Sequence, residues 1–388
     1  MERVVSRMSF PCPIVFGPGA VQELPRELAR LGAKRPLIVT DAGVAGAGLV
    51  RKVLEVLDRN QVRTAVWDGC TPNPTDKDVE AGLAAYRKEG CDSIIGLGGG
   101  SPIDCARLIR LMVNHPPPLS RYDDAKGGDQ FVTANVPPMV AIPTTAGTGS
   151  EVGRSGVATL PDTLRKTVIF SPHLLAGAAI IDPELTLGLP PGPTAATGID
   201  ALTHCIEAYL SKGQHPLADG LALDGIRRVG NYLVRAVKDG KQDLEARTEM
   251  MAAAMEGAIA FQKGLGACHS LAHGLTPIAG THHGLANALC LPAVLEFNRA
   301  AVPGRLAQVA LALGEAPADE ATLAKKCVER VRQLIIDTGI TPGLSRNGVQ
   351  ESMLAKVADK AFEDACHQSN PRACTREDLL ELAKASWS

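Results

Sequence analysis

The chain has 388 residues, of which 45% are hydrophobic and 21% charged, as is ordinary for globular proteins. Forty Lys and Arg residues against 42 Asp and Glu residues give a net charge of −2, and only 3% of residues are aromatic. These values argue against a nucleic-acid-binding surface, an anionic-membrane surface and a base-stacking platform. The sequence has no run of 18 apolar residues that would predict a transmembrane helix.

Ten cysteines are scattered along the chain, and none forms a C-x-x-C pair. No secretory signal is recognisable at the start of the sequence. Both features are typical of reduced thiols, so we expect a cytoplasmic protein.

The first half of the chain alternates short apolar segments with amphipathic ones, which is typical of a parallel sheet covered by helices. We expect helices at 43–58, at 76–88 and after Pro102. We expect a hairpin at 156–170, with its turn at Pro161-Asp162, and a surface loop at 116–136. Strands are expected at 36–41, 64–67, 93–97, 139–142 and 178–181.

After Pro190-Pro191-Gly192-Pro193 the sequence becomes rich in Ala and Leu, with helical periodicity. We therefore predict an α/β domain at 1–187 and an all-α domain at 188–388. Helices of the second domain are expected at 194–211, 218–236, 244–262, 319–338 and 375–386.

Two glycine-containing loops each follow a predicted strand. The first reads GLGGGSPID at 96–104, and the second reads PTTAGTGSE at 143–151. Glycines, hydroxyls and free N–H groups at a helix start favour a phosphate, and ligands of open α/β sheets bind at the carboxyl ends of strands. The two loops together suggest a dinucleotide-binding site, although each loop alone is compatible with a tight turn that binds nothing.

Asp41 ends the predicted strand at 36–41. A carboxylate there can accept hydrogen bonds from an adenosine ribose and would repel a 2′-phosphate, which favours NAD over NADP. The alternative is an Asp that caps the next helix.

Six of the nine histidines lie between residues 204 and 283. Asp200 and His204 are four residues apart, as are His269 and His273, so each pair shares a helix face; His283 follows. One carboxylate with several imidazoles suits Fe²⁺ or Zn²⁺. Histidines packed in a helical core are the alternative interpretation.

Because these motifs occur in the same order along the chain, the sequence resembles the iron-containing (group III) alcohol dehydrogenases over nearly its whole length. The most specific stretches are GGGSPID (98–104), PTTAGTGSEV (143–152), DALTHCIEAYLS (200–211), CHSLAHGL (268–275) and THHGLANA (281–288). One departure is Arg107, which stands where the family usually has Lys.

The resemblance implies a dehydroquinate synthase-like fold: an α/β NAD-binding domain at 1–187 and a helical metal-binding domain at 188–388. It implies a catalytic role for His273 near the nicotinamide. The offset of 14 residues from His269 (283 − 269) selects His283 over His282 as a ligand. The implied metal ligands are Asp200, His204, His269 and His283. The implied cofactor-binding residues are Asp41, Gly98, Gly99, Gly100, Ser101, Asp104, Thr144, Thr145 and Thr148.

The expected activity is hydride transfer between NAD(P), chiefly NAD, and a small alcohol, diol or hydroxy acid, with Fe²⁺ favoured and Zn²⁺ as the alternative. Alternatives on the same scaffold are a glycerol dehydrogenase-like and a maleylacetate reductase-like enzyme, and a different class is a non-catalytic metal or nucleotide sensor. The expected partner is a small-molecule alcohol or aldehyde, not nucleic acid or membrane. We expect a homodimer or larger homo-oligomer. The sequence does not specify the alcohol.

Overall fold

The computed structural model describes residue 8, residues 11–160 and residues 165–388. The described residues form two compact units. Of these residues, the α/β unit comprises those within 11–145 and 149–188, and the helical unit comprises 146–148 and 189–388. This division falls next to the predicted domain boundary after residue 187.

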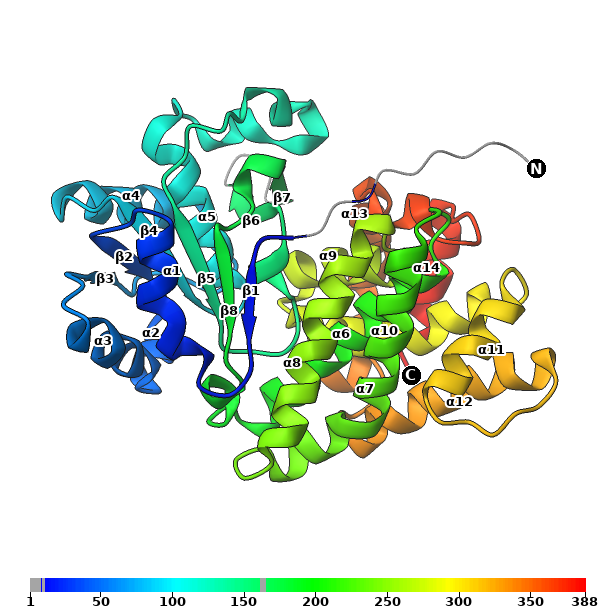
Figure 1. Ribbon diagram of the computed structural model, residues 1–388. Coiled ribbons are helices and arrows are strands. Elements are labelled where there is room, and N and C mark those ends of the chain that lie inside the picture. The colour runs from blue at the N-terminus through cyan, green and yellow to red at the C-terminus, as the bar shows by residue number, and fades with distance from the viewer. Residues whose placement is uncertain (1–7, 9–10, 161–164) are drawn as a thin grey trace. The chain divides into compact units, whose positions relative to one another are not determined.

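The α/β unit is built on a six-stranded sheet in which every pairing is parallel, as predicted (Figure 1). Its strand order is β1-β8-β5-β4-β2-β3. The strand β1 was not predicted, because only three residues separate Pro13 from Gly17 and such a short apolar segment is a weak signal. The strands are β1 (Ile14–Phe16), β2 (Pro36–Val39), β3 (Ala65–Trp67), β4 (Ser93–Gly98), β5 (Met139–Pro143) and β8 (Ala178–Ile181).

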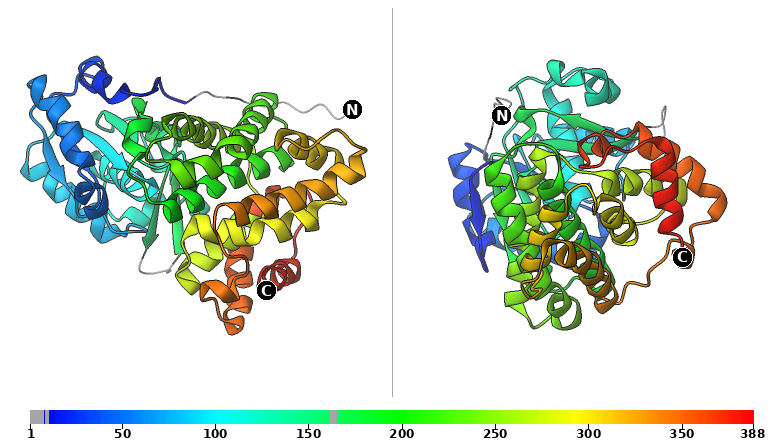
Figure 2. Two further views of the ribbon diagram at one scale, coloured as in Figure 1. Left: turned by 90° about the horizontal axis from the view of Figure 1, so that it is seen from below. Right: turned by 90° about the vertical axis from the view of Figure 1, so that its right-hand side faces the viewer.

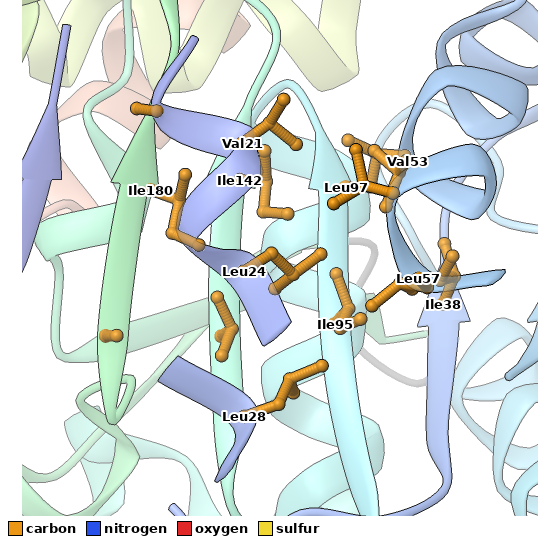
Figure 3. Packing of buried hydrophobic residues seen from close by; sticks show 14 of the residues in the cluster. Val21, Leu24, Leu28, Ile38, Val53, Leu57, Ile95, Leu97, Ile142 and Ile180 are labelled. Atoms are coloured by element: carbon orange, nitrogen blue, oxygen red, sulfur yellow. The ribbon is translucent and has the colours of Figure 1, made fainter. Parts of the chain in front are cut away.

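Helices of the α/β unit cover the sheet with apolar side chains. On one face, α1 and α3 pack against the sheet through Leu24, Leu28, Val53 and Leu57 (Figure 3). The helix α5 packs against β4 and β5. These helices are α1 (Leu24–Arg30), α2 (Ala42–Gly46), α3 (Leu49–Arg59), α4 (Asp76–Lys88) and α5 (Gly100–Asn114).

One prediction for this unit was wrong and another was incomplete. The expected helix at 43–58 is two helices, α2 and α3, because Gly48 adopts a left-handed backbone conformation (φ 77°) that interrupts the helix. The segment 116–136 is not simply a surface loop, since it forms short 3-10 turns and buries Leu119 and Tyr122. The predicted hairpin pairs β6 (Ser155–Leu160) with β7 (Arg165–Phe170), and its predicted turn at Pro161-Asp162 lies outside the described residues.

The helical unit forms no strand within residues 189–388, all of which are described. The helix α6 is buried over most of its length and packs against α7, α8 and α10 (Figures 1 and 2). No helix among the described residues is long and apolar enough to cross a membrane. The helices are α6 (Pro191–Leu210), α7 (Pro216–Asp239), α8 (Leu244–Ala260), α9 (Ala267–Ala279), α10 (His283–Asn298), α11 (Pro303–Ala312), α12 (Glu320–Asp337), α13 (Leu354–Glu363) and α14 (Arg376–Ala385).

Candidate active site and metal centre

Three helices of the helical unit carry the histidine cluster. Asp200 and His204 lie one turn apart on α6, His269 and His273 lie one turn apart on α9, and His283 is the first residue of α10. Because α6 and α9 both pack against α10, residues separated by up to 83 positions (283 − 200) meet inside one unit.

Ligand atoms of Asp200, His269 and His283 all lie within 4.8 Å of one another. Oδ1 of Asp200 is 3.5 Å from Nε2 of His283 and 3.9 Å from Nε2 of His269. The side chains of Asp200 and His269 are almost completely buried, and that of His283 is 21% exposed. One carboxylate oxygen and two imidazole nitrogens therefore converge on one point, which a divalent cation can share.

The fourth predicted ligand, His204, is not among these converging residues. Its ring stacks on that of His269, with centroids 4.6 Å apart and planes 22° apart, and it also contacts Phe261. Burial lowers the pKa of His204 to about 4, against the opposing charge of Asp200, so the imidazole is neutral at pH 7. Its buried Nδ1 has no hydrogen-bond partner among the described residues.

Asn287, one turn after His283 on α10, places its amide nitrogen at the convergence point. The nitrogen donates to Oδ1 of Asp200 (2.7 Å) and lies 3.3 Å from Nε2 of His283 and 3.4 Å from Nε2 of His269. A single donor group surrounded by these three acceptor atoms marks a position where positive charge is favoured, so the residues present fit a cation. Asn287 was not predicted as a site residue, although its spacing of four residues from His283 places it on the same face of a helix.

Glu207 is a second site residue that was not predicted from the sequence. Its carboxylate accepts a hydrogen bond from Nδ1 of His269 at 2.6 Å. Burial favours the neutral form of His269, but the hydrogen bond to Glu207 and the charges of Glu207 and Asp200 outweigh burial and raise the pKa of the imidazole. Glu207 lies three residues after His204 and seven after Asp200, on the same face of α6, and that spacing could have identified it.

His273 pairs with a carboxylate from a distant segment. Its Nδ1 donates to Oδ2 of Asp364 at 2.9 Å, while Oδ1 of Asp364 accepts hydrogen bonds from the hydroxyl of Ser270 (2.8 Å) and the N–H of Cys366 (2.9 Å). Burial would raise the pKa of Asp364, but the charge and hydrogen bond of His273 hold it well below its usual range. The His273 ring stacks on that of His283, with centroids 5.2 Å apart. His273 is thus oriented beside the ligand cluster.

Ligand atoms of His273, Asp364 and Cys366 also lie within 4.8 Å of one another. Both oxygens of Asp364 already accept the hydrogen bonds just described. Burial raises the pKa of the Cys366 thiol, which disfavours the thiolate that binds metals. The geometry therefore favours a carboxylate–histidine pair here over a second metal site.

The first glycine loop of the α/β unit lies at the carboxyl end of β4. Gly98 has φ +148°, and a Cβ there would lie 2.6 Å from Cγ of Pro102, so a side chain does not fit. Its carbonyl accepts a hydrogen bond from the N–H of Thr144 (2.9 Å), and Gly99 lies against the side chain of Thr145. The two loops are therefore neighbours at the ends of β4 and β5.

The start of α5 has features of an anion site. Gly99 is its N-cap residue, and no side chain in the described parts of the chain caps this end. The hydroxyl of Ser101 accepts a hydrogen bond from the N–H of Asn73 (3.3 Å). Backbone N–H groups of Gly100 and Ser101 stand at the positive end of the helix dipole.

Asp104 lies in a network with Arg107 below this loop. Its Oδ1 accepts from the hydroxyl of Ser150 (2.6 Å) and from Arg107 (3.2 Å), and its Oδ2 accepts from the N–H of Val157 (3.3 Å). The fully buried Arg107 also donates to the carbonyls of Ser150, Ser155 and Leu174. These bonds tie α5 to the second loop.

The other predicted cofactor residues lie as follows. Asp41 caps α2, since its Oδ1 accepts from the N–H of Val44 (2.8 Å), as the alternative interpretation expected. Thr144 is buried and Thr145 is half-buried, both in the α/β unit. Thr148 belongs to the short segment Ala146–Thr148, which packs with the helical unit.

Comparison with known proteins gives a consistent result. The family described as iron-containing alcohol dehydrogenase matches residues 11–183, and the C-terminal part of the Fe-containing alcohol dehydrogenase family matches 194–387. The chain is 43% identical to a 4-hydroxybutyrate dehydrogenase of Cupriavidus necator, with 95% of this chain and 96% of that protein covered. It is 36% identical to an NAD-dependent methanol dehydrogenase of Bacillus methanolicus, with 96% and 98% covered. The crystal structure of a 1,3-propanediol oxidoreductase matches with a TM-score of 0.94 and 37% identity, covering 98% of this chain and 100% of that one.

Proposed function

Because the chain belongs to the iron-containing alcohol dehydrogenase family, we propose that it is a metal-dependent, NAD-linked alcohol dehydrogenase that also works as an aldehyde reductase. The observation that carries the proposal is the convergence of Asp200, His269 and His283 on one point in the helical unit. The Asn287 amide surrounded by those three acceptors supports a cation at that point.

Asp200, His269 and His283 would hold the metal, with His204 as the fourth ligand. His204 is supported by its place one turn from Asp200 and by its buried, unpartnered Nδ1. Three neutral imidazoles and one carboxylate would neutralise only one of the two positive charges of a divalent metal, so the loaded site would keep a net charge of +1, which favours an anionic oxygen on the substrate. Imidazole and carboxylate ligands suit both candidates, and we propose Fe²⁺ with Zn²⁺ as the alternative.

Oxidation of an alcohol releases a hydride and a proton. When bound, NAD supplies the hydride acceptor, and the divalent metal supplies Lewis acidity at the substrate oxygen. His273 is the residue of this chain that we propose moves the proton. Because its Nδ1–H donates to Asp364, its Nε2 carries the lone pair that can accept a proton. In the reverse direction the same nitrogen returns the proton.

The glycine loops would hold the cofactor. We propose that Gly98, Gly99, Gly100 and Ser101 bind the pyrophosphate, that Thr144, Thr145 and Thr148 contact the cofactor, and that Asp104 keeps the loops together. Asp41 would accept a hydrogen bond from the adenosine ribose, which favours NAD over NADP. A carboxylate has two oxygens with about four lone-pair sites, so its capping bond to Val44 is compatible with this role.

The relatives named above act on short alcohols with one or two oxygen functions, so the proposed substrate is a short primary alcohol, diol or hydroxy acid. A homodimer or larger homo-oligomer in the cytoplasm also remains our proposal. The ten cysteines, all of them free thiols, are consistent with a reducing compartment.

The proposal is tested by measuring NAD reduction with a panel of 4-hydroxybutyrate, 1,3-propanediol, methanol, ethanol and glycerol. Protein purified without oxygen is assayed as isolated, after chelation, and after addition of Fe²⁺ or Zn²⁺. We expect turnover that disappears with chelation and returns with metal, and no return in Asp200→Ala. Tight NAD binding without turnover of any alcohol would favour the sensor. Metal-independent reduction of maleylacetate would favour the maleylacetate reductase-like alternative, and preference for glycerol the glycerol dehydrogenase-like one.

A further inference from the structure

The carboxylate of Glu207 lies at the N-terminus of α9, the helix that carries His269 and His273. It accepts hydrogen bonds from the backbone N–H groups of Gly266 (3.0 Å), Cys268 (2.7 Å) and His269 (3.3 Å). These donors would otherwise have no partner, because the first turn of a helix leaves its N–H groups unpaired. The positive end of the helix dipole also favours a negative charge there.

The same carboxylate makes a fourth bond, to the side chain of His269. Oε2 of Glu207 is 2.6 Å from Nδ1 of His269, and a carboxylate only accepts, so the proton of the imidazole resides on Nδ1. The other ring nitrogen, Nε2, then carries its lone pair toward Asp200 and His283. A metal-ligating imidazole needs this arrangement, and its second N–H usually contacts a carboxylate or carbonyl.

We propose that Glu207 is a positioning residue that sets both the tautomer of His269 and the placement of α9 against α6. This inference rests on the proposed function, because it assigns Nε2 of His269 to the metal. Glu207 shares a face of α6 with Asp200, so one helix supplies a ligand and also orients the ligand on the neighbouring helix.

The surroundings of Glu207 leave it no other chemical role. Its side chain is only 4% exposed, and it already accepts the four hydrogen bonds given above, so it is not placed to take a proton from substrate. Gly266 permits the close approach of the helix start, since a Cβ there would lie 2.6 Å from Oε1 of Glu207.

Asn370 offers a matched control. Its Oδ1 accepts from the N–H of Ala267 (3.3 Å), so it also caps α9, and it exchanges two hydrogen bonds with Asn298. It has no hydrogen bond to His269 among the described residues. A purely structural cap of α9 can therefore be removed without touching the imidazole.

The test compares Glu207→Gln with Asn370→Ala in full-length protein, by competition of Zn²⁺ or Co²⁺ with a chromophoric chelator and by thermal unfolding. We expect Glu207→Gln to weaken metal binding by roughly 10- to 100-fold. Asn370→Ala should lower the unfolding temperature and leave the metal affinity within about 3-fold of wild type. Equal metal affinity in Glu207→Gln and wild type would overturn the proposal, as would equal losses in the two variants.

A measurement on the wild-type chain covers the case in which Glu207→Gln fails to fold. Long-range ¹H–¹⁵N spectra of metal-free protein labelled at histidine report which ring nitrogen carries the proton, with the His269 signal assigned by its loss in His269→Gln. The spectra are recorded at a pH at which the His269 ring is neutral; protonation at Nδ1 then supports the proposal, and an Nε2–H tautomer overturns it. This readout needs no metal, so it tests the inference on Glu207 independently of the proposed function. If the proposed function is wrong, wild-type protein will bind no metal at the cluster, whichever tautomer His269 adopts.

Discussion

The loops after β4 and β5 present mainly backbone N–H groups and hydroxyls, whereas the cluster on α6, α9 and α10 presents imidazoles and carboxylates. Each loop is a contiguous stretch of about ten residues, and its shape follows from local features such as the positive φ of Gly98. The cluster is assembled from three helices, and two of its histidines are held by carboxylates that are distant in the sequence: His269 by the buried Glu207, and His273 by the partly exposed Asp364. The shape of a site built from backbone groups is determined by residues that are adjacent in the sequence. A site built from side chains also depends on hydrogen-bond partners that are far away in the sequence.

The sharpest test of the side-chain site compares the adjacent histidines. His283→Ala removes one of the converging ligands, whereas His282→Ala removes an exposed neighbour. A metal that lowers the barrier by several kcal/mol is worth on the order of 10³-fold in rate, so we expect His283→Ala to lose about that factor in kcat/KM. The measurements are alcohol-dependent NAD reduction and metal content after dialysis. His282→Ala should keep the wild-type activity and metal content. Equal losses in the two variants would show that His283 is not a metal ligand.

The supporting partner of His273 should have the next largest effect. Asp364→Asn removes the charge that orients the imidazole, so the rate of proton transfer falls while the metal ligands stay in place. We expect kcat to fall by roughly 10²-fold, as is typical when a general acid–base residue is lost, with metal content unchanged. The measurement is kcat across the pH range, with His273→Ala as the reference. If Asp364→Asn keeps the wild-type rate and pH profile, His273 does not depend on this carboxylate.

The backbone site should respond to a single added methyl group. Gly98→Ala places a Cβ against Pro102 and forces a residue with a side chain into φ +148°, and such strain costs about 1–3 kcal/mol. We expect the Kd for NAD, measured by calorimetry, to rise roughly 10-fold, with metal affinity unchanged. Gly46→Ala is the control, because it lies in α2 of the same unit with open space around it. Weakening by Gly46→Ala to the same extent would show that the effect is not specific to the loop.

The same contrast explains how much the sequence could predict. Strands such as β4 and β5 are short, continuously apolar segments, and the glycine loops follow them directly, so the parallel sheet and its loops were predictable. The break at Gly48 was not, because the apolar spacing continues through it. The partners of the histidines were missed because Glu207 lies 62 residues from His269, and Asp364 lies 91 residues from His273. Local patterns carry no information on which distant side chain completes a hydrogen bond.

His204 also shows a limit of prediction from sequence, this time for a residue that was predicted. Its spacing from Asp200 correctly predicts a shared helix face, and the motif that it belongs to implies a metal ligand. Whether its nitrogen points to the convergence point depends on the ring torsion, which packing against His269 and Phe261 determines. Sequence spacing specifies a helix face but not the direction of a ring.

The smallest expected effect is on stability and concerns Glu256, a buried carboxylate of the helical unit that lacks the several hydrogen bonds that Glu207 accepts. Burial raises the pKa of Glu256 to about 8, against the charge of Arg228 at 3.3 Å, and its buried Oε2 has no hydrogen-bond partner in the described part of the chain. The folded pKa lies above the ordinary value of 4.5, so between about pH 4.5 and pH 8 the folded protein binds more protons than the unfolded chain. The free energy of unfolding therefore falls as pH rises through this window.

Glu256→Gln removes this penalty, because an amide does not titrate. We expect the variant to gain stability over wild type between pH 5 and pH 8, by on the order of 1 kcal/mol at pH 8, in urea unfolding of the metal-loaded protein. Glu249→Gln is the control, since Glu249 also pairs with Arg228 but is more exposed, at 26% against 9% for Glu256. If Glu256→Gln and wild type lose stability in parallel with rising pH, the carboxylate is ionised throughout. Arg228 would then suffice to hold the buried charge, and the contrast with the multiply bonded Glu207 would disappear.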